Sequence, residues 1–158
     1  MITGRFFTMK LAEALIERKD VQNRLEALRA RLCACALTQE GEEPAEAPEK
    51  LMEELRFLTL RHEELCTRIN LTNSRNTVEG ETLTALLARR EALGNQHSIM
   101  ADFLNAAMQA PRRSSGREIK ILPTIKVSDL RDQLDEASKA LRQLDTKIQQ
   151  ANWNIDLI

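Results

Sequence analysis

The chain has 158 residues, of which 42% are hydrophobic, 30% charged and only 3% aromatic, with no tyrosine. Aromatic side chains line most ligand pockets and stack on single-stranded bases, so this composition argues against a small-molecule substrate pocket and a base-stacking surface. Lysine plus arginine (23) nearly match aspartate plus glutamate (24), and the two signs are interleaved. This balance disfavours nucleic acid and anionic membranes as partners.

The cysteines Cys33, Cys35 and Cys66 are an odd set without a CxxC pair, which is typical of proteins in a reducing compartment. No apolar stretch reaches the length of a signal-peptide core or a bilayer span. We therefore expect a cytoplasmic protein. A regular helical pattern starts at Met9, so residues 1–8 are predicted to be either an upstream start or a loosely attached arm.

Four stretches carry apolar residues at alternating steps of three and four, the spacing that lines one face of a helix in coiled-coil packing. We call each such line a seam. The seams run from Leu11 to Cys35, Leu51 to Ile69, Leu83 to Ala107 and Val127 to Ile155. They predict a mainly α protein, a single helical domain over residues 1–158, with long antiparallel helical hairpins in a four-helix, coiled-coil-like arrangement.

The first two helices are expected to form a hairpin over residues 9–72. The first helix should begin with Thr8 as N-cap and end near Leu37, and Pro48 fits the first turn of the second. A short connector favours antiparallel neighbours. If the two seams pair in antiparallel register starting at the loop, the facing residues are Cys35 with Leu51, Leu32 with Leu55, Leu25 with His62 and Arg18 with Ile69.

Residues 73–81 are predicted to be a connector, with a possible short strand at Thr77 and Val78 and turns supplied by Asn and Gly. The third helix should then span residues 82–110. This helix is interrupted only by Gly94-Asn95, which weakens it without necessarily breaking it.

Residues 111–127 combine a basic loop with an alternating, β-branched segment from Ile119 to Val127. This pattern predicts a short β segment around residues 117–127, bent at Pro123 because proline donates no ladder hydrogen bond. The fourth helix and the tail should occupy residues 128–158, with Ser128 as N-cap. The tail NWNIDLI ends on apolar residues that need a partner surface.

Four seam positions hold a basic or imidazole side chain where leucine is expected, namely Arg18, His62, Arg90 and His97. A polar seam residue commonly fixes helix register, and its charge can pair with a flanking carboxylate. His62 and Cys66 have the i, i+4 spacing of two zinc ligands, but a third ligand and the Glu-x-x-His motif are missing. We therefore predict register or pairing roles and no metal site.

An anion or nucleotide site is the alternative for the basic residues, because guanidinium groups suit phosphate geometry. The candidates are Arg90, His97, Arg112, Arg113 and Arg117. The basic loop lacks the GK[ST] ending of a P-loop, and no set of nucleophile, base and orienting residue is recognisable. The sequence predicts neither an enzyme nor a cofactor.

Several segments, in their order along the chain, resemble a family of small bacterial proteins known as septicolysin-like. They are MKLAEAL at 9–15, EGEEPAE at 40–46, RINLTN at 68–73, TLTALLARREAL at 82–93, REIK at 117–120 and LDTKIQQANWNIDLI at 144–158. The resemblance implies a largely helical bacterial protein without an established activity, and its name suggests a membrane-active cytolysin. It carries over no functional residue. The chain departs from the family pattern in its first eight residues, at Ala85 and at Arg113, where an acidic and an aromatic residue are expected.

The leading hypothesis is a cytoplasmic structural or interaction protein that self-associates through its helical hairpins, aided by pairing of the Ile119 to Val127 strand. Its basis is the number of apolar residues off the seams, for example Leu15, Phe57, Leu60 and Leu157. The alternatives are an anion- or nucleotide-binding helical module and a membrane-active protein.

Overall fold

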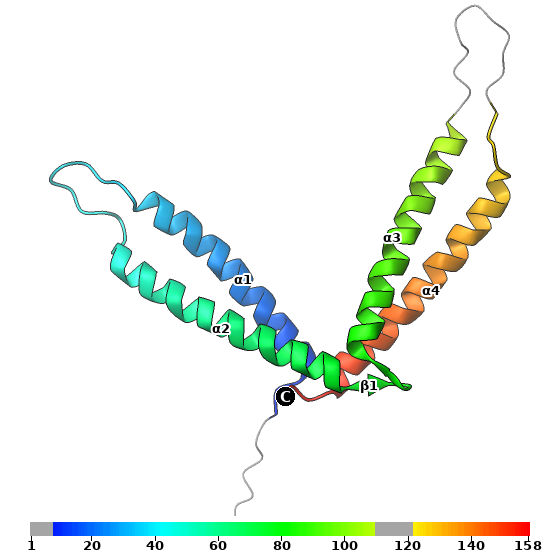
Figure 1. The fold of residues 1–158 in the computed structure, drawn as a ribbon. Coiled ribbons are helices and arrows are strands. Elements are labelled where there is room, and N and C mark those ends of the chain that lie inside the picture. Colours follow the sequence, from blue (N-terminus) through cyan, green and yellow to red (C-terminus); the bar gives the residue numbers. More distant parts are fainter. Residues whose placement is uncertain (1–7, 110–121) are drawn as a thin grey trace, which may run out of the picture. The chain divides into compact units, whose positions relative to one another are not determined.

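The computed structural model describes residues 8–109 and 122–158. In these residues the elements are α1 (Leu11–Ala34), α2 (Pro48–Arg75), β1 (Thr77–Val78), β2 (Glu81–Thr82), α3 (Leu83–Met108) and α4 (Val127–Asn154). Figure 1 shows α1 beside α2 as one helical hairpin and α3 beside α4 as another. The predicted mainly α fold class with long helical hairpins is confirmed.

The chain divides into two compact units. One consists of Met1–Leu83 with Gln150–Ile158, and thus holds α1, α2, the two short strands and the C-terminal tail. The other, Thr84–Gln149, holds nearly all of α3 and α4.

The core of the α1–α2 hairpin is one buried residue every seventh position on each helix. This spacing places a side chain over the facing helix every two turns. The buried residues at that spacing are Ala14, Val21, Leu28 and Cys35 on one side and Leu51, Leu58, Leu65 and Thr72 on the other. The Arg31 guanidinium donates to the Glu54 carboxylate at 3.2 Å, next to the predicted Leu32–Leu55 pair, so the predicted register agrees with the structure at this end.

The start of α2 was predicted correctly, whereas both ends of α1 differ from the prediction. Pro48 is at the first position of α2, as expected. The N-cap of α1 is Lys10 rather than Thr8, and the Lys10 backbone N–H donates to the Glu13 carboxylate at 2.7 Å. A carboxylate three residues into the helix therefore does the capping that a threonine hydroxyl was expected to do. The helix ends at Ala34, before Leu37, which is 91% exposed.

A two-residue turn joins β1 and β2 into a small antiparallel hairpin. Thr77 pairs with Thr82 and Val78 with Glu81. The two residues between them, Glu79 and Gly80, have φ angles of 53° and 86°. Positive φ at both central positions is the type I′ geometry that matches strand twist. The predicted strand at Thr77 and Val78 is confirmed, and its partner strand was not predicted.

The predicted β segment around residues 117–127 is wrong where the structure describes it. Residues 117–121 lie outside the described residues, residues 122–126 form no strand, and Val127 is the first residue of α4. The prediction took the alternation as a strand, but Pro123 cannot donate to a ladder and Val127 continues the helical seam instead. Ser128 is the second residue of α4 rather than its N-cap, and its hydroxyl donates to the Asp129 carboxylate at 3.1 Å.

The C-terminal tail is bonded to the start of α1 and the end of α2, an arrangement we call the terminal clasp. The Leu11 N–H donates to the Ile155 carbonyl at 2.9 Å, and the Leu157 N–H donates to the Met9 carbonyl at 2.8 Å. The Ile158 N–H donates to the buried Thr72 hydroxyl at 3.0 Å. The partner surface predicted for the tail therefore lies in the same unit, and only Leu157 of its apolar end is buried there.

Candidate functional site

An apolar strip on the outside of α3 is the main surface feature that the hairpin packing leaves unexplained. Ile99 and Phe103 are 70% and 47% exposed and lie one helical turn apart. A second series of three- and four-residue steps runs through them along the helix. We call this series the α3 strip, and all its members are exposed: Ala85, Ala88, Ala92, Gln96, Ile99, Phe103 and Ala106.

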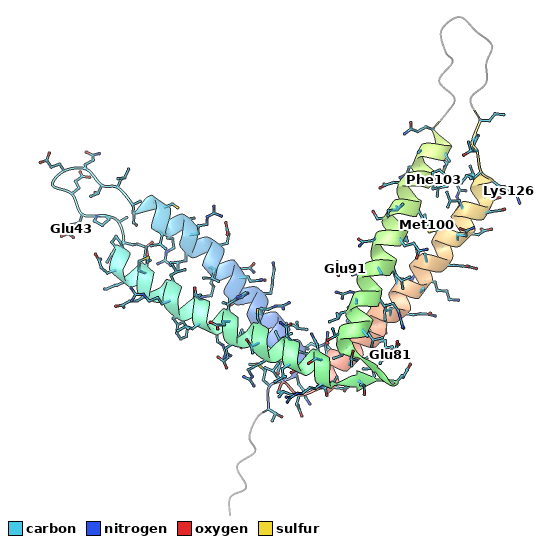
Figure 2. All side chains as sticks on the ribbon, viewed as in Figure 1. Glu43, Glu81, Glu91, Met100, Phe103 and Lys126 are labelled. Atoms are coloured by element: carbon cyan, nitrogen blue, oxygen red, sulfur yellow. The ribbon has the colours of Figure 1, made fainter. Side chains whose placement is uncertain are left out.

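The α3 strip is distinct from the face of α3 that carries the seam. Leu86 and Leu104 belong to that seam and are 0% and 8% exposed. At 100° per residue, the strip is centred more than a quarter of a turn around the helix from these leucines. Figure 2 labels Phe103 of the strip and the half-buried Met100 in the later part of α3. The helix is therefore apolar on two faces, whereas a surface helix ordinarily shows one apolar face.

The partner helix α4 has the ordinary pattern. Leu130, Leu144 and Ile148 are buried, and no large hydrophobic residue between Val127 and Gln150 is exposed. Its exposed residues are mostly charged or amide side chains. The two helices of this hairpin thus differ, because α3 presents an uncharged, mostly apolar strip to solvent and α4 does not.

Arg90 and His97, two of the predicted anion-site residues, make contacts across the α3–α4 seam. The Arg90 guanidinium lies 3.7 Å from the Asp145 carboxylate, with both side chains about half exposed. His97 Nε2 lies 2.7 Å from the Ser138 hydroxyl oxygen. These two contacts are seven residues apart on each helix, which is the spacing expected of residues that fix register.

The hydrogen-bond geometry also assigns the proton between His97 and Ser138. The Ser138 hydroxyl donates to the Leu134 carbonyl at 2.9 Å, so its oxygen is left to accept. His97 must then donate through Nε2–H, which both the neutral Nε2–H tautomer and the imidazolium can do. An imidazole that donates to a structural hydroxyl is not oriented as a general base toward a substrate.

His62 and Arg18 are not brought together with another predicted site residue among the described residues. His62 is paired with Cys66 on its own helix, with ring nitrogens 3.7 and 3.8 Å from the sulfur. Arg18 is half-buried and makes no ion pair within the described residues. Across residues 8–109 and 122–158, no three His, Cys, Asp or Glu side chains are grouped closely enough to hold a metal ion. Arg112, Arg113 and Arg117 lie outside the described residues.

Ion pairs on one flank of the α1–α2 hairpin use most of the charged side chains that face across it. Arg61 donates to Glu17 at 2.6 and 2.9 Å and to Glu64 at 2.7 Å. The hydrogen bond from Arg61 lowers the pKa of Glu64, with the positive charge of Arg61 adding to the effect. Arg31 likewise bonds Glu46 and lowers its pKa. Arg31 and Arg61 therefore form ion pairs in this hairpin although neither was among the basic residues predicted to pair.

Comparison with known protein families gives one match, which spans residues 18–157. The matching model describes a family of unknown function, DUF6847. The chain belongs to this family. The match includes α1 from Arg18 onward and all of α2, α3 and α4, and hence the whole α3 strip.

A solved structure is similar to this chain over nearly its whole length. A protein of Corynebacterium diphtheriae, described as a functionally unknown conserved protein, is 39% identical, with a TM-score of 0.89. The match covers 96% of this chain and 99% of that one. A comparison with curated proteins gave no match.

The septicolysin-like resemblance is wrong. The segments that carried it belong to a chain whose family model is DUF6847, and neither that family nor the Corynebacterium protein is connected with a septicolysin. Short segments in a shared order were not sufficient to identify the family. Within the part of the chain that the structure describes, no helix is both long and apolar enough to cross a bilayer.

The α3 strip was missed because the sequence was read for one seam per helix. Of the four off-seam residues that motivated self-association, Phe57 and Leu60 are 65% and 66% exposed, Leu15 is half-buried and Leu157 is buried in the terminal clasp. A search for a second series of three- and four-residue steps over residues 83–108 would have found the strip.

Proposed function

We propose that this DUF6847 member is a cytoplasmic interaction protein that associates with copies of itself through the α3 strip and catalyses no reaction. The observation that carries the proposal is the exposure of Ile99 and Phe103 on a strip without a charged residue. Removing apolar surface from water stabilises an association by roughly 25 cal/mol per Å². A strip of this kind on a helix whose other face is already packed favours a further helix as its partner.

The roles of the two histidines support the absence of catalysis in this proposal. His97 donates to Ser138 across a helix seam, and His62 lies against Cys66 within α2. Neither geometry resembles a base held ready for a substrate. Three free cysteines, Cys33, Cys35 and Cys66, are in keeping with a reducing cytoplasm.

Sedimentation velocity over protein concentrations from about 1 to 500 µM, a range that covers weak and transient interfaces, tests the proposal. We expect the wild type to shift from monomer toward a larger species as its concentration rises. The double variant Ile99→Glu with Phe103→Glu should remain a monomer throughout, because two carboxylates would be buried at the contact.

A matched control is Phe57→Glu with Leu60→Glu, which changes two exposed apolar residues on α2. This variant should associate as the wild type does. Circular dichroism confirms that both variants remain helical. A wild type that stays monomeric at the highest concentration overturns the proposal, and a loss of association in the α2 variant alone overturns the choice of surface.

A further inference from the structure

The α3 strip has a size pattern that is complementary to itself when the helix is reversed. Its first half carries the small residues Ala85, Ala88 and Ala92, and its second half carries the bulky Ile99 and Phe103 before ending on Ala106. When two copies of the strip are laid antiparallel about its midpoint, a small residue meets a bulky one at the two inner pairs, and Ala85 meets Ala106 at the outer pair. Binding to a partner of a different sequence would not require small residues in one half of the strip to match bulky residues in the other half.

We infer that two copies of the chain pair through α3 in an antiparallel, two-fold arrangement centred between Asn95 and Gln96; the inference rests on the proposed function. In this register Ala88 faces the partner's Phe103 and Ala92 faces the partner's Ile99. Gln96 faces the partner's Asn95 at the axis. The same patch contributes from both copies, as a two-fold contact requires.

The composition and length of the strip also set the distance between the two helix axes and the affinity of the pair. Alanine at four positions allows helix axes to approach toward the short end of the usual range of about 8–10 Å. The strip from Ala85 to Ala106 is about 33 Å long and one helix face wide, which gives a contact area of several hundred Å² per copy. Stable interfaces bury about 800 Å² per partner, so the pairing is in the range of transient, micromolar association.

A size-swap experiment tests the register directly. Phe103→Ala leaves a hole opposite Ala88, and Ala88→Phe places two phenylalanines against each other, so each change should weaken association at least about tenfold. The double variant Ala88→Phe with Phe103→Ala restores one small and one bulky residue in each facing pair. We expect its dissociation constant to return to within about threefold of the wild-type value, a difference below 1 kcal/mol. Both positions are exposed, so folding of the single chain is not at stake.

Cysteine cross-linking separates antiparallel from parallel pairing. Gln96→Cys lies beside its own copy at the two-fold axis and should form a disulfide-linked dimer on mild oxidation. Ala85→Cys should not, because the two copies of this residue would be about 30 Å apart along an antiparallel pair. The native cysteines stay in place, and mass spectrometry identifies which cysteines are joined.

The outcomes distinguish this inference from the proposed function. Association that persists without rescue in the size swap, or with an Ala85→Cys cross-link, overturns the antiparallel register and leaves self-association standing. Absence of any association in the wild type overturns both. Rescue together with a Gln96→Cys dimer supports the two-fold pairing.

Discussion

The two hairpins of this protein are built alike at their seams and differently on their outer surfaces. In the α1–α2 hairpin, ion pairs of Arg31 and Arg61 run along a flank, and the exposed large hydrophobic residues Ile16, Met52, Phe57 and Leu60 are divided between the two helices. In the α3–α4 hairpin, a long, mostly apolar strip lies on the outside of α3, and the ion pair of Arg90 with Asp145 has a distance of 3.7 Å.

Two regular seams can therefore belong to hairpins whose outer surfaces need different partners. Surface charge pairs contribute little to stability, but they keep a flank solvated. An apolar strip has the opposite effect, because it leaves surface whose burial still lowers the free energy. We therefore expect the α1–α2 hairpin to be stable without a partner. The α3–α4 hairpin should be stabilised by association with another copy of the chain.

The largest expected effect separates the cores of the two hairpins. Leu58 and Leu86 are both 0% exposed, so Leu58→Ala and Leu86→Ala should each cost about 2–5 kcal/mol. Amide hydrogen exchange with mass spectrometry should place the loss in α1 and α2 for the first variant and in α3 and α4 for the second. The exposed Leu60→Ala is the control and should change stability by less than about 0.5 kcal/mol. A loss spread equally over both hairpins would contradict the comparison.

A smaller effect is expected at the terminal clasp, which only the first unit possesses. The buried Thr72 hydroxyl donates to the Arg68 carbonyl at 2.8 Å and accepts from the Ile158 N–H. Thr72→Val keeps the shape but leaves that N–H without its partner, at a cost of about 1–3 kcal/mol in urea unfolding. Thr72→Ser keeps the hydroxyl and should lose less. Equal losses in both variants would mean that the methyl group, and not the hydrogen bond, holds the tail.

The smallest effect concerns acid stability of the ion-paired flank. Because arginine hydrogen bonds lower the pKa of Glu46 and Glu64, their contribution is present above the ordinary carboxyl pKa of about 4.3 and is lost as pH falls through the lowered values. The melting temperature of the wild type should therefore fall between about pH 4.5 and pH 3. Arg61→Gln should flatten this fall and cost below about 1 kcal/mol at neutral pH.

Arg90→Gln is the matched control on the other hairpin, since its contact with Asp145 is longer and half exposed. Its pH profile should run parallel to that of the wild type. If Arg90→Gln flattened the profile as much as Arg61→Gln, the ion pairs would not distinguish the two hairpins.

Features set by local chemistry were predictable from the sequence. The heptad spacing identified all four helices, Pro48 marked the start of α2, and the strand at Thr77 and Val78 was recognised. The roles of Arg90 and His97 as seam contacts also followed from their positions, since each bonds a residue of the facing helix.

Features that depend on residues distant in the chain were not predictable. The bond between Leu157 and Met9 joins residues at opposite ends of the sequence, and no local period encodes it. The strand predicted up to Val127 failed because a two-residue alternation over a few residues is also compatible with the entry to a helix. The α3 strip was visible in the residues but could be recognised only once the seam face was known to be covered.

The seven-residue interval between buried side chains limits the lengths that the α1–α2 hairpin can have. From Ala14 to Cys35 and from Leu51 to Thr72, both helices carry a buried side chain at every seventh position. Deleting seven residues from one helix and the facing seven from the other would shorten the hairpin by about 10.5 Å and leave every remaining side chain on its original face. A deletion of one to six residues rotates the rest of the helix by at least about 40° and moves the buried row away from the facing helix. Seven residues are therefore the smallest step by which the length of the hairpin can change, and both helices must change together.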